Sequence, residues 1–417
     1  MDSSVSHRRV LFLPGFDPAP ARAHRERYRR EGAAQAEISG YEIAVSSDPA
    51  QNPHAWQVRA TIDGHETQAQ IDVLVWSDLV RAAMEGGISA RYLQMLRTAW
   101  RYIGSGAIWR LMRLRKGPVI AALYPVAALL LQAAIAVIIG AAASYLAFSA
   151  SERAMIAIEG DRSTQSGFLL RAGSAALLAL WVTWRLLRLF KDRDGWFLAH
   201  YLMQDYAYTA ARDGAYPPEL SDRLAGFTEK LIAASGAGDE VLLVGHSSGA
   251  YLAVTVLADA LRSGRVAEAP RIGLLTLGQV VPMASFLPRA DRLRADLAYL
   301  AASECITWVD VTAPGDGCAF ALCDPVAVSG VAPARKLWPR VISAAFSQTL
   351  QPQTWARLRW RFFRLHFQYL CAFDRPGDYD YFAITAGPQS LGDRFAGRAA
   401  SASRIEAPVN RYRSMAA

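Results

Sequence analysis

The chain has 417 residues, of which 52% are hydrophobic and 20% charged, and its mean hydropathy is +0.11. This composition excludes a disordered, collagen-like or disulfide-stapled chain, and it is more apolar than that of a routine soluble enzyme. The net charge of +8 suits an anionic membrane or a nucleic acid, so the position of the charge must decide between them. The four cysteines make no disulfide framework, and we interpret them as reduced thiols.

The N-terminal part alternates strands with a helix. An apolar strand is predicted over residues 10–13 and ends at Pro14-Gly15, and a helix is predicted over residues 21–36. Further strands are predicted over residues 41–46, 58–62 and 71–76. This order of elements favours a mainly parallel α/β sheet.

Two apolar segments follow. No charged residue occurs from residue 117 to residue 151, and the run over residues 166–184 has Arg171 as its only charge. About 20 apolar residues are enough for a helix to cross a bilayer, so the sequence predicts a transmembrane hairpin over residues 117–190. The alternative is a buried core hairpin of a soluble protein.

The charges beside these segments predict an orientation. Six basic residues and no acid occupy residues 97–116, and four more basic residues lie between residues 185 and 193. The connector carries both signs. By the positive-inside rule, both soluble parts face the cytoplasm, and the protein belongs to the cytoplasmic (inner) membrane. This placement accounts for the surplus charge, and no zinc-finger, helix-turn-helix or RNP-like pattern supports nucleic-acid binding.

The C-terminal part alternates again. Helices are predicted over residues 196–212, over a stretch ending at 234, and over 248–263 and 290–302, and strands over 241–244, 272–277 and 306–311. Neither part has enough strands for a sheet of its own. We therefore expect one doubly wound, mainly parallel α/β sheet interrupted by the hairpin. The expected division is residues 1–116 and 191–395 for this domain, 117–190 for the hairpin, and 396–417 for a loosely held tail.

A G-x-S-x-G pattern joins the strand at 241–244 to the following helix. Its central residue, Ser247, would project its hydroxyl from a sharp strand-to-helix turn, which Gly245 and Gly249 permit. The N–H of Ser248 would then face a developing oxyanion. The alternative is a strand–glycine–helix turn without a function.

These residues resemble the nucleophile elbow of the α/β-hydrolase superfamily. The resemblance implies the chain order serine, acid, histidine, and His366 is the only histidine after Ser247. The family usually holds this histidine in a loop, whereas residues 355–367 predict a helix of arginines and aromatics. That helix suits either a membrane interface or a core helix with one charged face. The resemblance also implies that the N–H of Phe16, in LPGFDP, is the second oxyanion donor.

The acid of the triad has three candidates. Asp316, in PGDG after the strand at 306–311, fits the family position best, while Asp310 lies within the strand and Asp324 lies late. The stretch TLGQVVP (residues 276–282) and the Asp316 loop are similar to segments of class 3 lipases, which favours lipid-like esters.

The sequence as a whole therefore predicts a membrane-anchored serine hydrolase. It would cleave carboxylic esters or thioesters of lipid or acyl-chain substrates through an acyl-enzyme, with the triad Ser247, Asp316 and His366. We expect no cofactor and no metal. An acyltransferase with the same triad, or a non-catalytic membrane scaffold, is the alternative.

Overall fold

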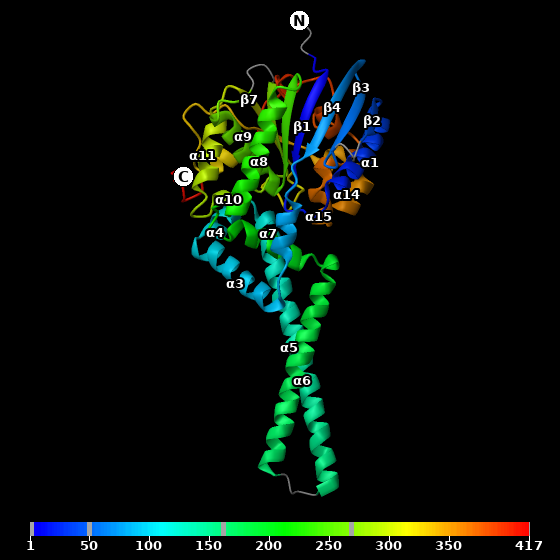
Figure 1. Cartoon of the computed structure of the whole chain (residues 1–417), viewed down its shortest axis with the longest axis vertical. Helices are drawn as coiled ribbons and strands as arrows, with labels where there is room; N and C mark the ends of the chain where they lie inside the picture. The colour runs from blue at the N-terminus through cyan, green and yellow to red at the C-terminus, as the bar shows by residue number, and fades with distance from the viewer. Residues whose placement is uncertain (1–3, 48–51, 160–163, 267–270, 417) are drawn as a thin grey trace. The chain divides into compact units, whose positions relative to one another are not determined.

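The computed structural model describes residues 4–47, 52–159, 164–266 and 271–416 (Figure 1). It divides into two compact units. The sheet unit comprises Met1–Ala83, Trp100–Ala121 and Tyr208–Ala417, and the helical unit comprises Met84–Ala99 and Ala122–Ala207. The sheet unit is thus built from sequence both before and after the two apolar segments.

The sheet unit contains an eight-stranded sheet in the order β2-β3-β4-β1-β5-β6-β7-β8. Its strands are β1 (His7–Leu13), β2 (Glu42–Ser46), β3 (Ala55–Ile62), β4 (His65–Val73), β5 (Glu240–His246), β6 (Arg271–Leu277), β7 (Ile306–Thr312) and β8 (Arg340–Ser343). Strands β4, β1 and β5 to β8 are parallel neighbours, so the prediction of a mainly parallel α/β sheet is confirmed.

Three features of the sheet differ from the prediction. Strand β3 runs antiparallel to β2 and β4, because Asp63 and Gly64, at φ 55° and 78°, close a tight hairpin between β3 and β4. Strand β4 lies earlier than expected and ends at Val73. The four-residue edge strand β8 was not predicted, since two of its residues are only half-buried and no apolar run marks it.

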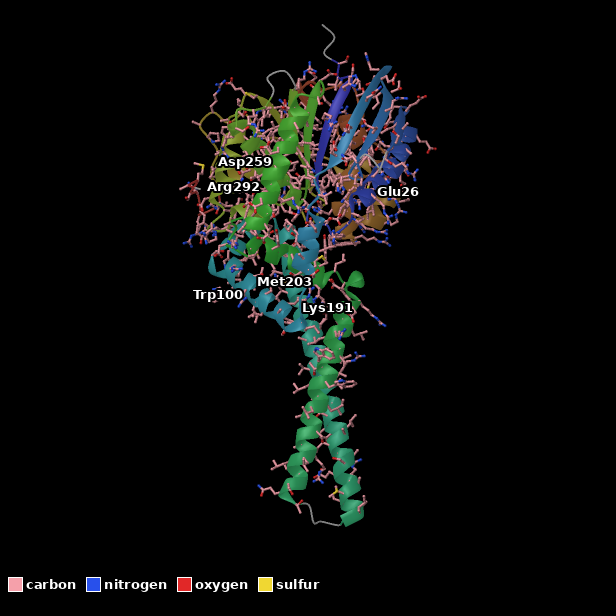
Figure 2. All side chains as sticks on the ribbon, viewed as in Figure 1. Glu26, Trp100, Lys191, Met203, Asp259 and Arg292 are labelled. Carbon is pink, nitrogen blue, oxygen red and sulfur yellow. The ribbon has the colours of Figure 1, made fainter. Side chains whose placement is uncertain are left out.

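Helices cover both faces of the sheet. The helices wholly or mostly in this unit are α1 (Ala21–Ser39), α2 (Ser77–Met84), α4 (Ala107–Leu114), α8 (Pro218–Ser235), α9 (Ser248–Arg262), α10 (Val281–Ser285), α11 (Asp291–Ala301), α12 (Pro325–Val328), α13 (Phe346–Thr349), α14 (Pro352–Leu358), α15 (Phe362–His366), η2 (Gln368–Leu370), α16 (Tyr381–Ala386) and α17 (Leu391–Phe395). Helices α8, α9 and α11 pack side by side on one face, and Arg292 of α11 pairs with Asp259 of α9 (Figure 2). Helices α1, α16 and α17 enclose the core on the other face.

The arginine-rich helix predicted over residues 355–367 is two short helices, α14 and α15. Between them Arg361 has a non-helical backbone, with φ −100° and ψ 66°. The break has a packing reason: Trp355 lies against Gly315 and Phe362 against Gly317, two residues further on. A straight helix would separate these two rings by about 10 Å along its axis, too far for that pair of contacts.

The C-terminal segment is held more firmly than expected. Ser401 N–H donates to Val341 O at 2.8 Å, and Ile405 N–H donates to Leu322 O at 2.7 Å. Asn410 is buried and its side-chain amide donates to Ser285 O at 3.0 Å. The expectation of a loose tail is therefore wrong for residues 396–416, because these bonds attach it to the sheet unit.

The helical unit is formed around two long apolar helices. It contains most of α3 (Ile88–Gly104), α5 (Lys116–Glu159) and α7 (Ala199–Ala210), together with α6 (Gln165–Asp192) and η1 (Asp194–Trp196). The spans Lys116–Ile158 and Gln165–Asp192 are long and apolar enough to cross a membrane. Their most apolar windows are only 22% and 6% buried, whereas a core helix of a soluble protein is mostly buried.

Candidate functional site

Ser247 occupies a strained turn between β5 and α9. Its backbone has φ 59° and ψ −124°, a region that non-glycine residues adopt rarely. The flanking glycines are required sterically: a Cβ on Gly245 would lie 2.6 Å from Gly249 O, and one on Gly249 would lie 2.7 Å from Pro14 O. Ser247 N–H donates to Leu277 O at 2.9 Å, which ties the turn to the end of β6. The motif therefore forms the strand-to-helix turn that the sequence predicts.

His366 and Asp316 form a buried hydrogen-bonded pair. Asp316 follows β7 and His366 ends α15, and His366 Nδ1 lies 2.7 Å from Asp316 Oδ2. The same carboxylate accepts the hydroxyl of Tyr369 at 3.0 Å and the N–H of Cys318 at 2.9 Å. Three donors thus fix the carboxylate. One of them is Tyr369, for which no sequence motif predicts a role.

The imidazole and the serine lie at the same edge of the sheet. Leu277 O accepts the N–H of Ser247, and a Cβ on the next residue, Gly278, would lie 3.2 Å from His366 Cε1. Both groups are thus adjacent to the carboxyl end of β6. No hydrogen bond joins Ser247 Oγ to His366 within the part of the chain that the structure describes, and in enzymes such bonds often form only with substrate bound.

The other two candidate acids have different partners. Asp310 accepts the hydroxyl of Thr276 at 2.6 Å, and burial raises its pKa to about 8. Asp324 begins α12, accepting the N–H groups of the next turn at 3.0 Å, and it pairs with Lys336. Neither hydrogen-bonds His366 among the described residues, so Asp316 is the candidate that the structure brings to the imidazole.

The loop that carries Phe16 lies against the Ser247 turn. A Cβ on Gly15 would lie 2.9 Å from Ser247 Cβ, so only glycine fits this close approach. Phe16 N–H donates to Ser248 Oγ at 2.8 Å and therefore does not point freely into the site. The N–H of Ser248 donates to no other described residue. Asp17 accepts Ala19 N–H at 2.9 Å, which is the role of a turn residue.

His246, the variable residue of the motif, contacts the candidate base. Its Nε2 lies 2.9 Å from His366 O, and the two ring centroids are 4.9 Å apart. Burial, and then the positive charge His366 can carry, hold the pKa of His246 well below its usual range. A neutral ring that donates to a carbonyl stabilises the backbone at His366. The sequence offered no signal for this role beyond the neighbouring Ser247.

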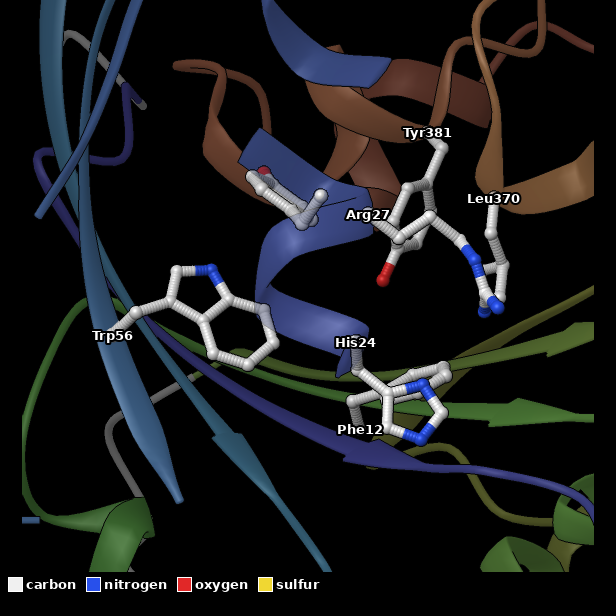
Figure 3. A pocket seen from close by; sticks show the side chains of 7 residues that line it. Phe12, His24, Arg27, Trp56, Leu370 and Tyr381 are labelled. Carbon is white, nitrogen blue, oxygen red and sulfur yellow. The ribbon is translucent and has the colours of Figure 1, made fainter. Parts of the chain in front are cut away.

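A small pocket is lined in part by a third histidine, His24 (Figure 3). It is lined by Phe12, His24, Arg27, Tyr28, Trp56, Leu370 and Tyr381. Burial lowers the pKa of His24 to about 4, against the opposing effect of Asp17, whose carboxylate is 3.9 Å away. The Arg27 guanidinium lies 4.6 Å from the ring centroid of Phe367, which in turn packs against His246. Arg27 and Phe367 therefore connect this pocket to His246.

Metal binding is also conceivable on geometry alone. Asp316, Cys318 and His366 each offer one ligand atom, and these atoms lie within 4.8 Å of one another. An ion ligated by His366 Nδ1 would have to displace the hydrogen bond between His366 and Asp316. The donor set thus fits an imidazole–carboxylate pair better than a metal centre, and the expectation of no metal and no cofactor stays a prediction.

Comparison of the chain with protein-family models, with curated proteins and with solved structures finds no match. The functional argument therefore depends on the residues of this chain and their geometry.

Proposed function

We propose that the chain is a membrane-anchored serine hydrolase with an α/β-hydrolase fold, which cleaves carboxylic esters or thioesters of lipids or other acyl-chain substrates. One observation carries the proposal: Ser247, in a strained turn at φ 59°, shares a sheet edge with the buried His366–Asp316 pair. A serine hydroxyl becomes a useful nucleophile only with a base beside it, and a carboxylate on the far nitrogen holds that base in the right tautomer.

Each residue of the triad has its own role in the proposed reaction. Ser247 Oγ attacks the carbonyl carbon while His366 Nε2 takes its proton, and Asp316 stabilises the imidazolium through Nδ1–H. We assign the oxyanion to the N–H of Ser248 and to the Ser248 hydroxyl, which accepts Phe16 N–H at 2.8 Å and keeps its own proton to donate. His366 then returns the proton to the leaving alcohol or thiol. Water, deprotonated by His366, hydrolyses the acyl-enzyme and regenerates Ser247.

The membrane assignment rests on α5 and α6. Because basic residues precede the first apolar segment and follow the second in the sequence, we place the sheet unit on the cytoplasmic side of the inner membrane. Anchoring concentrates the enzyme where lipid esters lie, which is why lipidic substrates are favoured. Nothing in the proposal requires a cofactor.

The test is covalent labelling with a fluorophosphonate probe, which reacts with activated serines. Detergent-solubilised wild type should be labelled, and Ser247→Ala and His366→Ala should not. Ser263→Ala, an exposed serine just after α9, is the matched control and should be labelled like wild type. Folded wild type that neither reacts with the probe nor turns over lipid and short-chain esters would contradict the proposal and favour a scaffold.

A further inference from the structure

Helices α14 and α15 carry an unusual concentration of unpaired positive charge. We call residues 352–364 the arginine–aromatic segment. Its four arginines, all exposed, are Arg357, Arg359, Arg361 and Arg364. None of them forms an ion pair with any residue that the structure describes, and no acid occurs from residue 325 to residue 373. Other exposed arginines of the sheet unit do pair in several places, as Arg265 does with Glu229 at 2.7 Å.

The same segment exposes aromatic rings. Trp360 is 71% exposed and Phe362 is 49% exposed, and their rings meet edge to face with centroids 6.3 Å apart. The Arg359 guanidinium lies 5.5 Å from the Trp360 ring. Trp355, by contrast, turns inward against Gly315. Exposed tryptophan and phenylalanine among arginines are typical of surfaces that lie in the headgroup region of a bilayer.

The segment also lies where the chain leaves the sheet unit for the first apolar helix. A Cβ on Gly317 would lie 3.0 Å from the Phe362 ring, and a Cβ on Gly117, in the first turn of α5, would lie 3.2 Å from Gly317 O. Helix α4, just before α5, adds Trp109, which is 60% exposed, and the exposed Arg113. The basic aromatic surface is thus continuous with the start of a helix that can cross a membrane.

We propose that the arginine–aromatic segment docks the sheet unit on an anionic phospholipid surface, with the arginines on lipid phosphates and Trp360 and Phe362 between the headgroups. Charge complementarity identifies the partner, because four unpaired guanidiniums next to a membrane attract anionic lipid. Helix α15 ends at His366, so docking also brings the candidate base to the lipid surface. This last consequence rests on the proposed function, whereas the docking itself does not.

The test measures the depth of the segment in a bilayer. A fluorescent non-natural amino acid is placed at Trp360 in the full chain, reconstituted in nanodiscs that contain a brominated, quenching phosphatidylcholine with or without phosphatidylglycerol. The control carries the same probe at Thr61, an exposed residue of β3 beside its hairpin with β4. We expect quenching at position 360 that increases with phosphatidylglycerol, and none at position 61. Equal quenching at the two positions would overturn the proposal.

Two charge variants separate docking from general electrostatics. The quadruple variant R357Q/R359Q/R361Q/R364Q should lose the phosphatidylglycerol-dependent quenching at position 360. The control R29Q/R30Q/R265Q/R335Q removes four exposed, ion-paired arginines and should keep it. Phosphatidylglycerol-dependent quenching that persists in the first variant would overturn the proposal. A first variant that keeps this quenching and instead loses binding to a single-stranded oligonucleotide would also overturn it.

The same samples distinguish this inference from the proposed function. Fluorophosphonate labelling of Ser247 reports the triad and needs no docking. Quenching at position 360 in the Ser247→Ala variant reports docking and needs no activity. Either measurement can therefore fail while the other succeeds.

Discussion

The backbone N–H of Phe16 donates a hydrogen bond of 2.8 Å to the hydroxyl of Ser248. The bond joins the loop after β1 to the first residue of α9, directly beside Ser247. A hydroxyl that accepts one hydrogen bond still has its own proton to donate. The Phe16 N–H therefore orients the Ser248 hydroxyl, and we expect this hydroxyl to act as an oxyanion donor beside the backbone N–H of Ser248.

Replacing Ser248 with alanine tests this arrangement. Loss of one oxyanion donor costs about 10²–10³ in kcat in a well-studied serine protease. Here the change also releases Phe16 N–H toward the substrate, so we expect a smaller loss of about tenfold in kcat with KM nearly unchanged. Ser248→Thr keeps the hydroxyl and should retain most activity. Steady-state ester hydrolysis measures both constants, and an unchanged kcat in Ser248→Ala would show that the hydroxyl is not a donor.

Asp316 and Asp324 give a second contrast. Asp316→Asn leaves the packing almost intact but removes the negative charge and replaces one accepting oxygen with an NH₂ donor, so we expect ester turnover to fall by about 10²–10⁴. Asp324→Asn weakens the cap of α12 and the pairing with Lys336, which lowers thermal stability and leaves turnover of the folded protein within about twofold. Ester kinetics and thermal unfolding of both variants distinguish these two roles. Loss of turnover in Asp324→Asn, with turnover kept in Asp316→Asn, would instead assign the acid of the triad to Asp324.

Local sequence patterns were sufficient to predict the turn at Ser247. A glycine on each side of a serine, placed between an apolar strand and a helix, has few other conformations, and the structure forms that turn. The mainly parallel sheet was predictable for a similar reason, since its central strands are apolar runs separated by helices. Strand β8 was missed because a short edge strand depends on neighbours far away in the chain, whereas the hairpin at Asp63-Gly64 has a local turn signal and was predictable.

The partners of the histidines could not be predicted in the same way. Tyr369 donates to Asp316 across 53 positions, and His246 contacts the carbonyl of His366 across 120. Such contacts depend on how distant segments pack, and no local pattern records them. The break between α14 and α15 has the same origin, because it follows from the contacts of Trp355 and Phe362 with a remote glycine-containing loop.

Asp310 predicts a pH dependence of stability. Burial raises its pKa to about 8 in the folded chain, against about 4 when the chain is unfolded. Between these values the folded state holds the proton and the unfolded state does not. The contribution of Asp310 to the stability of the folded chain is therefore complete below about pH 4, and it is lost as the pH rises toward 8.

Asp310→Asn removes this titration while keeping an oxygen that can accept the Thr276 hydroxyl. The apparent Tm of the variant, relative to wild type, should therefore rise steadily from about pH 5 to about pH 8 and then level off. Thermal unfolding followed by tryptophan fluorescence in detergent measures the difference. A Tm difference that is constant across this range would show that Asp310 is ionised in the folded protein.

The packing of α5 against α6 gives the last prediction. A Cβ on Gly140 would lie 2.7 Å from Ala179 O and would also overlap Thr183 Oγ1, so the two helices approach as closely as glycine allows. The nearby Ser144 hydroxyl donates to Ala175 O at 2.8 Å, which depends on the same short separation. Small residues at such crossings let helix backbones approach closely, and the resulting packing and hydrogen bonds stabilise helix pairs in a bilayer.

Gly140→Ala should therefore push the helices apart and lower the thermal stability of the detergent-solubilised protein by about 1–3 kcal/mol, the usual effect of overpacking. Gly173→Ala is the matched control, since nothing lies within 4 Å of a Cβ at that position and alanine favours helix. Disulfide trapping of cysteines placed at Ser144 and Ala175 should slow in the first variant and not in the second. Equal stability and equal trapping in both variants would mean that Gly140 does not lie at the helix crossing.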